Sequence, residues 1–279
     1  MQNTSREQPL VSVIIPTYNS DRFLEKCLES LRRQTWKNVE VIIADDGSTD
    51  KTLEIAEKYG CKMIENPRRG RAEAKNEGMK HSSGGYLLFV DSDMELTSNV
   101  ITECVELANE DLHIGGIVIP EHSVGGSLWV KVRDFERSFY SGSVIESARF
   151  FPAKLAKGVG GFEEGLVFFE ESTLPYKIQR GKRSSFPRIE AFILHHEEDF
   201  SLERWLMKKF YYGKTAHSYM HKYKEYALVQ TSAWYRLALF LKNWRAFLSR
   251  PKLAFGAILL KSMEYLATTS GLIYSKLGL

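Results

Sequence analysis

Two short clusters of acidic residues stand directly after apolar runs that are typical of buried strands. Asp45 and Asp46 follow residues 41–44, and Asp91-Ser92-Asp93 follows residues 87–90. The carboxyl ends of parallel strands meet at one edge of an open α/β sheet, which is where such sheets bind ligands. Carboxylates in an Asp-x-Asp pattern can hold a divalent cation, and the cation can in turn hold a diphosphate. We therefore expect an enzyme that binds a nucleoside-diphosphate compound.

Apolar runs and helical spacings alternate along the first 120 residues. The apolar runs predict strands at residues 11–15, 39–44, 61–65, 86–90 and 114–119, the first of them ending at Pro16. Helical patterns occupy residues 21–33 and 98–109 and also follow Asp50 and Gly70. This alternation predicts an α/β fold with a mostly parallel central sheet flanked by helices on both faces. Further strands are expected within residues 144–151 and 189–196.

Composition narrows the class of protein. The 279 residues are 43% hydrophobic and 26% charged, which fits a folded globular chain. The net charge of +3 is weak evidence for any partner, and we expect no nucleic acid. Three widely spaced cysteines, Cys27, Cys61 and Cys104, indicate reduced thiols in the cytosol and argue against a disulfide scaffold or a zinc site.

Residues 201–279 form a basic, aromatic and helical segment with an amphipathic pattern. Two of its predicted helices, at residues 226–249 and 252–276, are separated by Arg250-Pro251. Trp and Tyr suit a membrane interface, and Lys and Arg suit anionic headgroups. We expect this appendage to bind the cytoplasmic face of the cell membrane, peripherally or shallowly inserted, with Lys261 extending toward the headgroups. An oligomer interface or a helical cap over the sheet is the alternative.

Five segments in order resemble the family 2 inverting glycosyltransferases of the GT-A fold. They are Val-Ile-Ile-Pro-Thr-Tyr-Asn at residues 13–19, Ala-Asp-Asp-Gly-Ser-Thr-Asp at 44–50, Ala-Lys-Asn-Glu-Gly at 74–78, Asp-Ser-Asp at 91–93, and Gly-Phe-Glu-Glu-Gly at 161–165 followed by Phe-Glu-Glu at 169–171. Ser-Leu-Glu-Arg-Trp at residues 201–205 is similar to the Gln-x-x-Arg-Trp segment of cellulose-synthase-like members, with Ser in place of Gln. The resemblance covers about residues 9–215.

The resemblance implies a GT-A catalytic domain at residues 1–200 and a helical, membrane-associating segment at residues 201–279. The donor-binding half would occupy about residues 9–120 and the acceptor half about residues 121–200. The implied donor is GDP-mannose or a UDP-sugar, and the acceptor we expect is lipid-linked, such as a polyprenyl phosphate or a growing glycan. The cofactor would be Mn²⁺ or Mg²⁺, which neutralises the departing nucleoside diphosphate.

The resemblance also assigns roles to single residues. Asp93, and after it Asp91, would hold the metal, with His195 as a further candidate. Glu171, and after it Glu170, would be the catalytic base, although the family usually has Asp where Glu171 stands. Trp205 would contact the acceptor. The residues expected to bind the donor are Pro16, Thr17, Tyr18, Asn19, Asp45, Asp46, Gly70, Arg71, Lys75, Asp91, Ser92, Asp93 and Arg204.

Residue chemistry supports part of this assignment. Tyr18 offers a ring on which a nucleobase can stack. Arg68, Arg69 and Arg71 surround Gly70, and a glycine-containing basic loop brings both backbone N–H groups and cations close to phosphate. Two alternatives remain open. One is a glycosyltransferase that acts on a soluble glycan and uses its helices as an oligomer interface. The other is an inactive nucleotide-sugar-binding homologue, which the unusual Glu171 would explain.

Overall fold

A computed structural model of the chain describes residues 8–65, 69–111, 113–181, 184–198 and 200–277. The chain divides into two compact units. Unit 1 contains the residues up to Pro120, Ala148–Gly165 and Glu171–Ile193; unit 2 contains Glu121–Ser147, Leu166–Glu170 and Leu194–Leu279. Unit 2 thus takes segments from before residue 200, in addition to the expected C-terminal helices.

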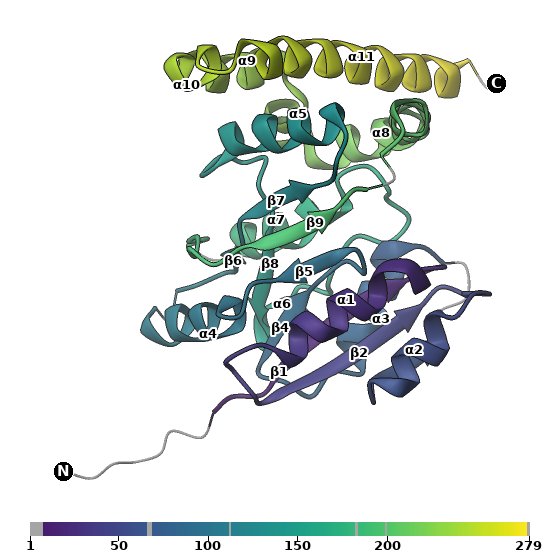
Figure 1. Cartoon of the computed structure of the whole chain (residues 1–279), viewed down its shortest axis with the longest axis vertical. Helices are drawn as coiled ribbons and strands as arrows, with labels where there is room; N and C mark the ends of the chain where they lie inside the picture. Colours follow the sequence, from purple (N-terminus) through teal and green to yellow (C-terminus); the bar gives the residue numbers. More distant parts are fainter. Residues whose placement is uncertain (1–7, 66–68, 112, 182–183, 199, 278–279) are drawn as a thin grey trace. The chain divides into compact units, whose positions relative to one another are not determined.

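A six-stranded sheet forms the centre of unit 1 (Figure 1), with the strand order β3-β2-β1-β4-β8-β6. The strands are β1 Val11–Thr17, β2 Val39–Asp45, β3 Lys62–Glu65, β4 Tyr86–Phe89, β6 Ile117–Val118 and β8 Ala148–Pro152. The first four run parallel to one another, whereas β8 runs antiparallel to β4 and β6. The sheet is therefore mostly parallel, as the sequence predicts.

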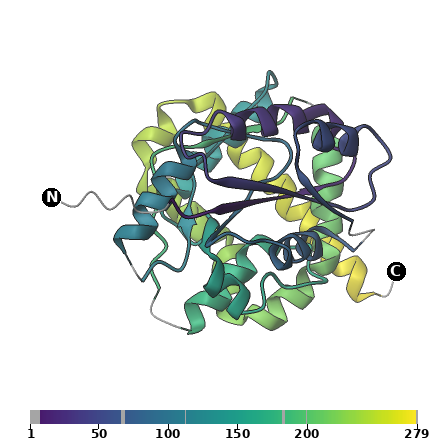
Figure 2. The ribbon, with the colours of Figure 1, turned by 90° about the horizontal axis from the view of Figure 1, so that it is seen from below.

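Helices cover both faces of this sheet (Figure 2). One apolar cluster joins the sheet to α1 Asp21–Arg32, α2 Thr52–Lys58 and α4 Val100–Glu110. A second cluster, on the other face, includes residues of α3 Arg71–Lys80, α6 Ala153–Gly158 and α7 Thr173–Gly181. The strands alternate between the two clusters, since Val13 and Ile15 belong to the first and Ile14 to the second. Two short elements complete the unit, β5 Met94–Leu96 and the end of the η2 turn Glu170–Ser172, from Glu171 onward.

The first strand is longer than predicted. It does not end at Pro16 but continues to Thr17, in register with Asp45 of β2. Proline lacks an N–H donor, but its carbonyl can still accept a hydrogen bond, so it does not have to end a strand. Beyond it, the Thr17 carbonyl accepts the N–H of Asp46 at 2.8 Å and continues the pairing of β1 with β2. The extra residue brings the side chain of Thr17 to the end of the strand, next to the first acidic cluster.

Unit 2 is mainly helical. Its strands β7 Glu121–Val124 and β9 Ile193–His196 are neighbours in a smaller sheet. Its helices are α5 Leu128–Arg137, η1 Ser138–Tyr140, α8 Leu202–Thr231, α9 Ala233–Lys242, α10 Trp244–Leu248 and α11 Pro251–Lys276. The helix predicted over residues 226–249 is thus three pieces, the end of α8 followed by α9 and α10. Aromatic rings fill the core, where Phe139 contacts both Phe240 and Phe247 edge-on.

The long helices α8 and α11 approach each other closely at two glycines. A Cβ added to Gly213 would lie 2.1 Å from the Thr268 carbonyl oxygen, and one added to Gly271 would lie 2.0 Å from that of Phe210. A side chain at either position would push the helices apart, so glycine is required at this crossing. Among the described residues, no helix has the length and hydropathy of a transmembrane span.

Candidate active site

The carboxylate of Asp45 organises the turn that follows β2. It is buried and accepts four hydrogen bonds: from the Thr17 hydroxyl at 2.8 Å, the Gly47 N–H at 3.0 Å, and the Ser48 N–H and hydroxyl at 2.7 and 2.6 Å. A carboxylate has about four acceptor positions. The protein itself therefore occupies the acceptor capacity of Asp45, and this residue shapes the turn that joins the ends of β1 and β2.

Further hydrogen bonds tie the loop after β1 to its neighbours. The Asn19 N–H donates to the Ser48 hydroxyl at 2.9 Å, and the Asn19 side-chain oxygen accepts the Thr49 N–H at 2.9 Å. Asn19 has a positive φ of 47°, a conformation that asparagine tolerates better than most residues. From the other side, the Ser92 hydroxyl donates to that of Ser20 at 2.9 Å. The loops after β1, β2 and β4 therefore meet, as the sequence predicts for the carboxyl edge of the sheet.

Tyr18 stands out in this group because it is 57% exposed. Asn19 is hydrogen-bonded to Ser48 in the turn after β2, and Ser20 to Thr52 at the start of α2, so the backbone that carries the ring is held in place. A large exposed aromatic ring on a fixed loop suits contact with a flat ligand such as a nucleobase.

Asp91 and Asp93 occupy the turn after β4, and sequence reasoning missed the cation beside them. Arg149 of β8 lies 3.4 Å from Asp91 through Nη2 and donates to the Phe89 carbonyl at 3.5 Å through Nη1. The guanidinium partly balances the negative charge of the turn. Arg149 lies beside Asp91 because β8 pairs antiparallel with β4, a pairing that the sequence does not predict.

The basic loop before α3 is anchored by the second acidic residue of β2's turn. Oδ1 of Asp46 accepts the backbone N–H of Arg69 at 2.9 Å and that of Gly70 at 3.4 Å. Gly70 has a φ of 108°, which favours glycine. Arg71 is exposed at the first turn of α3, whereas Lys75 is buried with its ammonium 5.2 Å from the centroid of the Phe162 ring. Arg68 lies outside the described residues.

Asn76 of α3 clamps the loop at residues 161–165, and sequence reasoning gave it no role. Its side chain accepts the Phe162 N–H at 2.8 Å and donates to the Phe162 carbonyl and to Glu164, both at 3.0 Å. A Cβ on Gly161, which has a φ of 69°, would lie 2.3 Å from the Asn76 oxygen. The Gly-Phe motif is therefore explained by this contact, because only glycine leaves room for the asparagine.

The same loop is held by α7 and by the start of α3. The Thr173 hydroxyl accepts the Glu163 N–H at 3.0 Å, Lys177 donates to the Gly161 carbonyl at 2.9 Å, and Glu73 accepts the Gly165 N–H at 2.7 Å. The chain that leads from this loop to the candidate base residues thus starts from a rigid support.

The candidate bases Glu170 and Glu171 form the η2 turn with Ser172. Glu170 is buried, with 3% of its surface exposed, whereas Glu171 is half-buried. The residue before them, Phe169, has a positive φ of 54° and stacks on Tyr219 of α8 within unit 2. Backbone strain of this kind is found at functional sites, where the surrounding packing maintains it. Glu170 belongs to unit 2 and Glu171 to unit 1.

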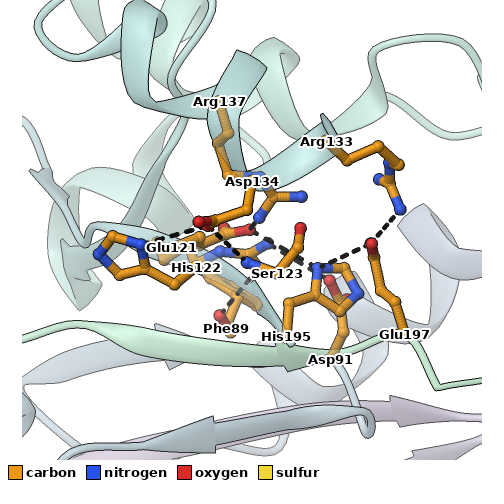
Figure 3. Close-up of polar contacts among 11 residues, drawn as sticks. Phe89, Asp91, Glu121, His122, Ser123, Arg133, Asp134, Arg137, His195 and Glu197 are labelled. Carbon is orange, nitrogen blue, oxygen red and sulfur yellow. Dashed lines mark hydrogen bonds and ion pairs between the residues drawn. The ribbon is translucent and has the colours of Figure 1, made fainter. Parts of the chain in front are cut away.

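His195 lies in a chain of charged groups in unit 2 (Figure 3). Its Nδ1 is 3.8 Å from Glu121 and 3.9 Å from Glu197. Arg137 pairs with Glu121, and Arg133 pairs with Glu197. Each carboxylate that faces the imidazole is therefore already neutralised by an arginine. In the same view His122 pairs with Asp134 at 3.2 Å.

Trp205 of α8 is embedded among charged side chains of unit 2. Its indole N–H donates to Glu264 at 2.6 Å, and Arg133 and Lys209 lie 3.9 and 4.3 Å from ring centroids of the indole. Burial opposes ionisation of Glu264, but the charges of Lys209 and Lys261 prevail and lower the pKa of Glu264 to about 2. Arg204, the preceding residue, is exposed.

Lys261 is part of this buried network and does not extend outward as the sequence analysis expected. Its ammonium lies 2.7 Å from Glu136 and 2.6 Å from Glu264. Burial alone would lower the pKa of Lys261, but these two carboxylates raise it above its ordinary value. The expectation was wrong because Glu136, which pairs with Lys261, lies far away in the sequence.

Oxygen ligands for a cation are present, but they do not form a complete cage. In the part of the chain that the structure describes, no three His, Cys, Asp or Glu side chains converge on a point that could hold a metal ion. Mg²⁺ in nucleotide sites is commonly held by one or two carboxylates together with substrate phosphates and water. Asp91 and Asp93 after β4 fit that kind of site, in which phosphates of a bound substrate would supply the remaining ligands.

Comparisons with known proteins add to this geometry. The model of the Glycosyl transferase family 2 matches residues 12–159. Glycosyltransferase GlyA of Streptococcus pneumoniae is 29% identical over 62% of this chain and 31% of its own length. An uncharacterized glycosyltransferase of Bacillus subtilis, EpsJ, is 38% identical over 37% of this chain and 31% of its own length. The chain thus spans about a third of each of these relatives.

Solved structures share the fold over nearly the whole chain. A mannosyltransferase of Pyrobaculum calidifontis, PcManGT, in complex with GDP-Man and Mn²⁺, has a TM-score of 0.68 at 18% identity, with 97% of this chain and 88% of that one covered. Residues 1–349 of TarS of S. aureus, in complex with UDP-GlcNAc, have a TM-score of 0.61 at 17% identity, with coverage of 96% and 92%. At these identities the likeness establishes the fold alone.

Proposed function

The chain belongs to glycosyl transferase family 2 and has the GT-A fold, and from that premise we propose that it transfers a sugar from a nucleoside-diphosphate donor to an acceptor hydroxyl with inversion at the anomeric carbon. The observation that supports this most is the junction of the loops after β1, β2 and β4, made by the Thr17–Asp45 and Ser20–Ser92 hydrogen bonds. It gathers an exposed ring, two turns and the Asp-x-Asp segment at one edge of the sheet.

The donor would be GDP-mannose or a UDP-linked sugar, with GDP-mannose tested first. Tyr18 would stack on the base, and the turn fixed by Asp45 would line it. Asp46 holds Arg69 and Gly70 in the basic loop, so that Arg71 stands at the N-terminus of α3, where a diphosphate is favoured. The neighbouring folds were solved with GDP-Man and with UDP-GlcNAc, which supports testing both nucleotides.

Mn²⁺ or Mg²⁺ would be held by Asp93 and Asp91. Such an ion, when bound, neutralises charge on the departing nucleoside diphosphate. Arg149, whose guanidinium lies 3.4 Å from Asp91, partly balances the negative charge of this turn. His195 is a weaker candidate, because both carboxylates beside it are paired with arginines.

Glu171 would be the base, with Glu170 second. As the acceptor oxygen bonds to the anomeric carbon and the bond to the nucleoside diphosphate breaks, the carboxylate takes the proton of the acceptor hydroxyl. Glu171 is half-buried, which leaves it accessible to an acceptor, whereas Glu170 is almost fully buried. Asn76 holds the loop at residues 161–165, which leads in the sequence to Glu170 and Glu171.

The acceptor we propose is lipid-linked, and the enzyme would work at the cytoplasmic face of a membrane. Support comes from the exposed aromatic and basic side chains of the C-terminal helices. Arg204 is exposed and remains available for a phosphate or pyrophosphate. The indole N–H of Trp205 is hydrogen-bonded to Glu264, and Arg133 lies against its ring. We therefore propose that Trp205 helps to position the acceptor-binding part of the protein.

Donor binding and turnover test this function. Thermal unfolding is followed with GDP, UDP, GDP-mannose and UDP-sugars, with and without Mn²⁺, and nucleotide release is measured in parallel. A donor that binds the native state raises its unfolding temperature. We expect one nucleotide class to stabilise the protein in a Mn²⁺-dependent manner and its sugar to be turned over.

Two variants separate binding from chemistry. Asp93→Asn should abolish the Mn²⁺-dependent stabilisation, whereas Glu171→Gln should bind the donor normally and lose turnover. Glu57→Gln, an exposed change on α2, is the matched control and should behave as the wild type. Normal binding without turnover in the wild-type protein would instead favour an inactive homologue, and no response to any nucleotide would refute the proposal.

A further inference from the structure

The three C-terminal helices present large apolar side chains to solvent. The exposed fraction is 80% for Trp234, 69% for Phe255 and 69% for Leu266. Monomeric soluble proteins seldom leave so many large apolar side chains uncovered in one region. We call this set the outer apolar face; its members are Trp234, Leu237, Leu241, Trp244, Leu248, Phe255, Ile258, Leu259, Leu266 and Ile273.

Helix α11 is apolar on two opposite sides. Its exposed members recur at spacings of three, four and seven residues, which keeps them on one stripe of an α-helix. The buried residues Ala257, Leu260 and Glu264 follow the same spacings half a turn away. One stripe of α11 therefore packs inside unit 2, and the other, which also carries Ser262 and Thr269, leaves large apolar side chains uncovered.

The exposed stripes of the three helices point away from the same supporting elements. Phe240 of α9 packs on Phe139 of η1, and Phe247 of α10 packs on Phe135 of α5. A Cβ on Gly256 of α11 would lie 2.6 Å from Val132 of α5. Because all three helices bury one side against α5 and η1, their opposite sides form one outer surface, and Figure 1 shows them as a single layer beside α5.

The charges around this surface have one sign. Glu264 is the only acidic residue in residues 226–279, and it is buried in the network with Lys261 and Trp205. The exposed charged side chains of the three helices and the turns between them are all basic: Lys242, Arg245, Arg250, Lys252 and Lys276. The surface therefore combines exposed Trp and aliphatic side chains with positive charge.

We propose that the outer apolar face docks on the headgroup region of an anionic bilayer, with α11 lying in the plane of the membrane. Trp side chains favour the interface, aliphatic side chains enter the acyl boundary, and basic side chains are attracted to anionic headgroups. A second copy of the chain is a poorer occupant, because self-association through this face would bring basic side chains against one another.

This inference rests on the proposed function in one respect: docking on a bilayer would bring the enzyme to a lipid-linked acceptor. The two can fail separately. Donor hydrolysis in solution does not need the face, and docking on vesicles needs neither donor nor metal. The surface also differs from a spanning segment, since no described helix is long and apolar enough to cross a bilayer.

Flotation of the full chain with vesicles tests the docking. One set contains phosphatidylcholine with about 30 mol% phosphatidylglycerol and the other phosphatidylcholine alone. We expect the wild-type protein to float with the anionic vesicles and much less with the neutral ones. Trp234→Ser combined with Trp244→Ser should lower the partition coefficient at least about tenfold, while Met63→Ser, an exposed apolar change on β3, should leave it unchanged.

A second variant pair tests the charge term. Arg245→Gln combined with Lys252→Gln should remove most of the preference for anionic vesicles, whereas Lys58→Gln combined with Lys80→Gln should not. Far-UV circular dichroism and an unfolding temperature like those of the wild type show that each variant is folded. Wild-type protein that stays at the bottom of the gradient with both vesicle types overturns the inference. So does a stable dimer in solution whose two outer faces are buried against each other, because the occupant is then a second copy.

Discussion

Removing the Asn76 side chain should loosen the loop that precedes the candidate base. Asn76 is 3% exposed, and its amide satisfies both the N–H and the carbonyl of Phe162. In Asn76→Ala these two buried backbone groups lose their partner. Each unsatisfied group costs about 1–3 kcal/mol, so the variant should lose about 2–6 kcal/mol of unfolding free energy. The lost contact with Glu164 adds little, because that side chain is exposed.

Urea unfolding followed by circular dichroism measures this loss. Asn76→Asp provides a sharper comparison, since it keeps an acceptor for the Phe162 N–H but turns a donor into a carboxylate that faces a carbonyl and Glu164. We expect it to be at least as unstable as Asn76→Ala. Lys80→Ala, an exposed change on the same helix, should shift stability by less than about 0.5 kcal/mol.

The clamp should also affect turnover more than donor binding. The hydrogen bonds of the Asn76 side chain go to Phe162 and Glu164, which lie outside the loops after β1, β2 and β4, so the donor dissociation constant should change little. A displacement of a catalytic group by about 1 Å can cost about 100-fold in rate, so turnover should fall at least about tenfold. Wild-type stability in Asn76→Ala would refute the clamp. A loss of donor affinity equal to the loss of turnover would refute its link to the base.

Three further changes have defined outcomes. The pKa of Glu264 is lowered from 4.5 to about 2 in the folded state, so its stabilisation is complete above pH 4.5 and is lost as the pH falls toward 2. Glu264→Gln should therefore unfold less steeply with acid than the wild type, while costing about 3–5 kcal/mol at neutral pH, as measured by urea titrations at several pH values. Gly271→Ala places a Cβ 2.0 Å from the Phe210 carbonyl and should cost about 1–3 kcal/mol in thermal unfolding, whereas Gly181→Ala, with open space around it, should not. Asp45→Asn should weaken donor binding about tenfold in calorimetry, because a neutral amide is a poorer acceptor for the four donors that fix the turn; unchanged affinity would mean that the turn does not line the donor.

Local patterns carry most of what the sequence predicts about unit 1. Each buried strand is an apolar run in the sequence, and turn-forming residues follow it. Short segments are therefore enough to predict that Asp45, Asp46 and Asp91 lie at the carboxyl edge of the sheet. Pro16 misled the prediction of where β1 ends because a proline is tolerated in a strand when its missing N–H is not needed there.

Contacts between distant segments are what the sequence did not predict. Arg149 reaches Asp91 only because β8 pairs antiparallel with β4, and such pairing has no local signal. Asn76 meets Phe162 across 86 residues, although the positive-φ Gly161 beside Phe162 hints at a close approach. Lys261 looked like a charge that interrupts an apolar helix, but a carboxylate from α5 makes it part of a buried ion pair.

The anomeric configuration of the product tests the central claim most directly. Proton NMR of a reaction with the preferred donor, Mn²⁺ and a lipid-linked acceptor should show a product of opposite configuration to the donor, released together with one nucleoside diphosphate per transfer. Folded Glu171→Gln protein should yield none of this product. A product that retains the donor's configuration, or full transfer by Glu171→Gln and Glu170→Gln alike, would contradict direct displacement assisted by a carboxylate of the η2 turn.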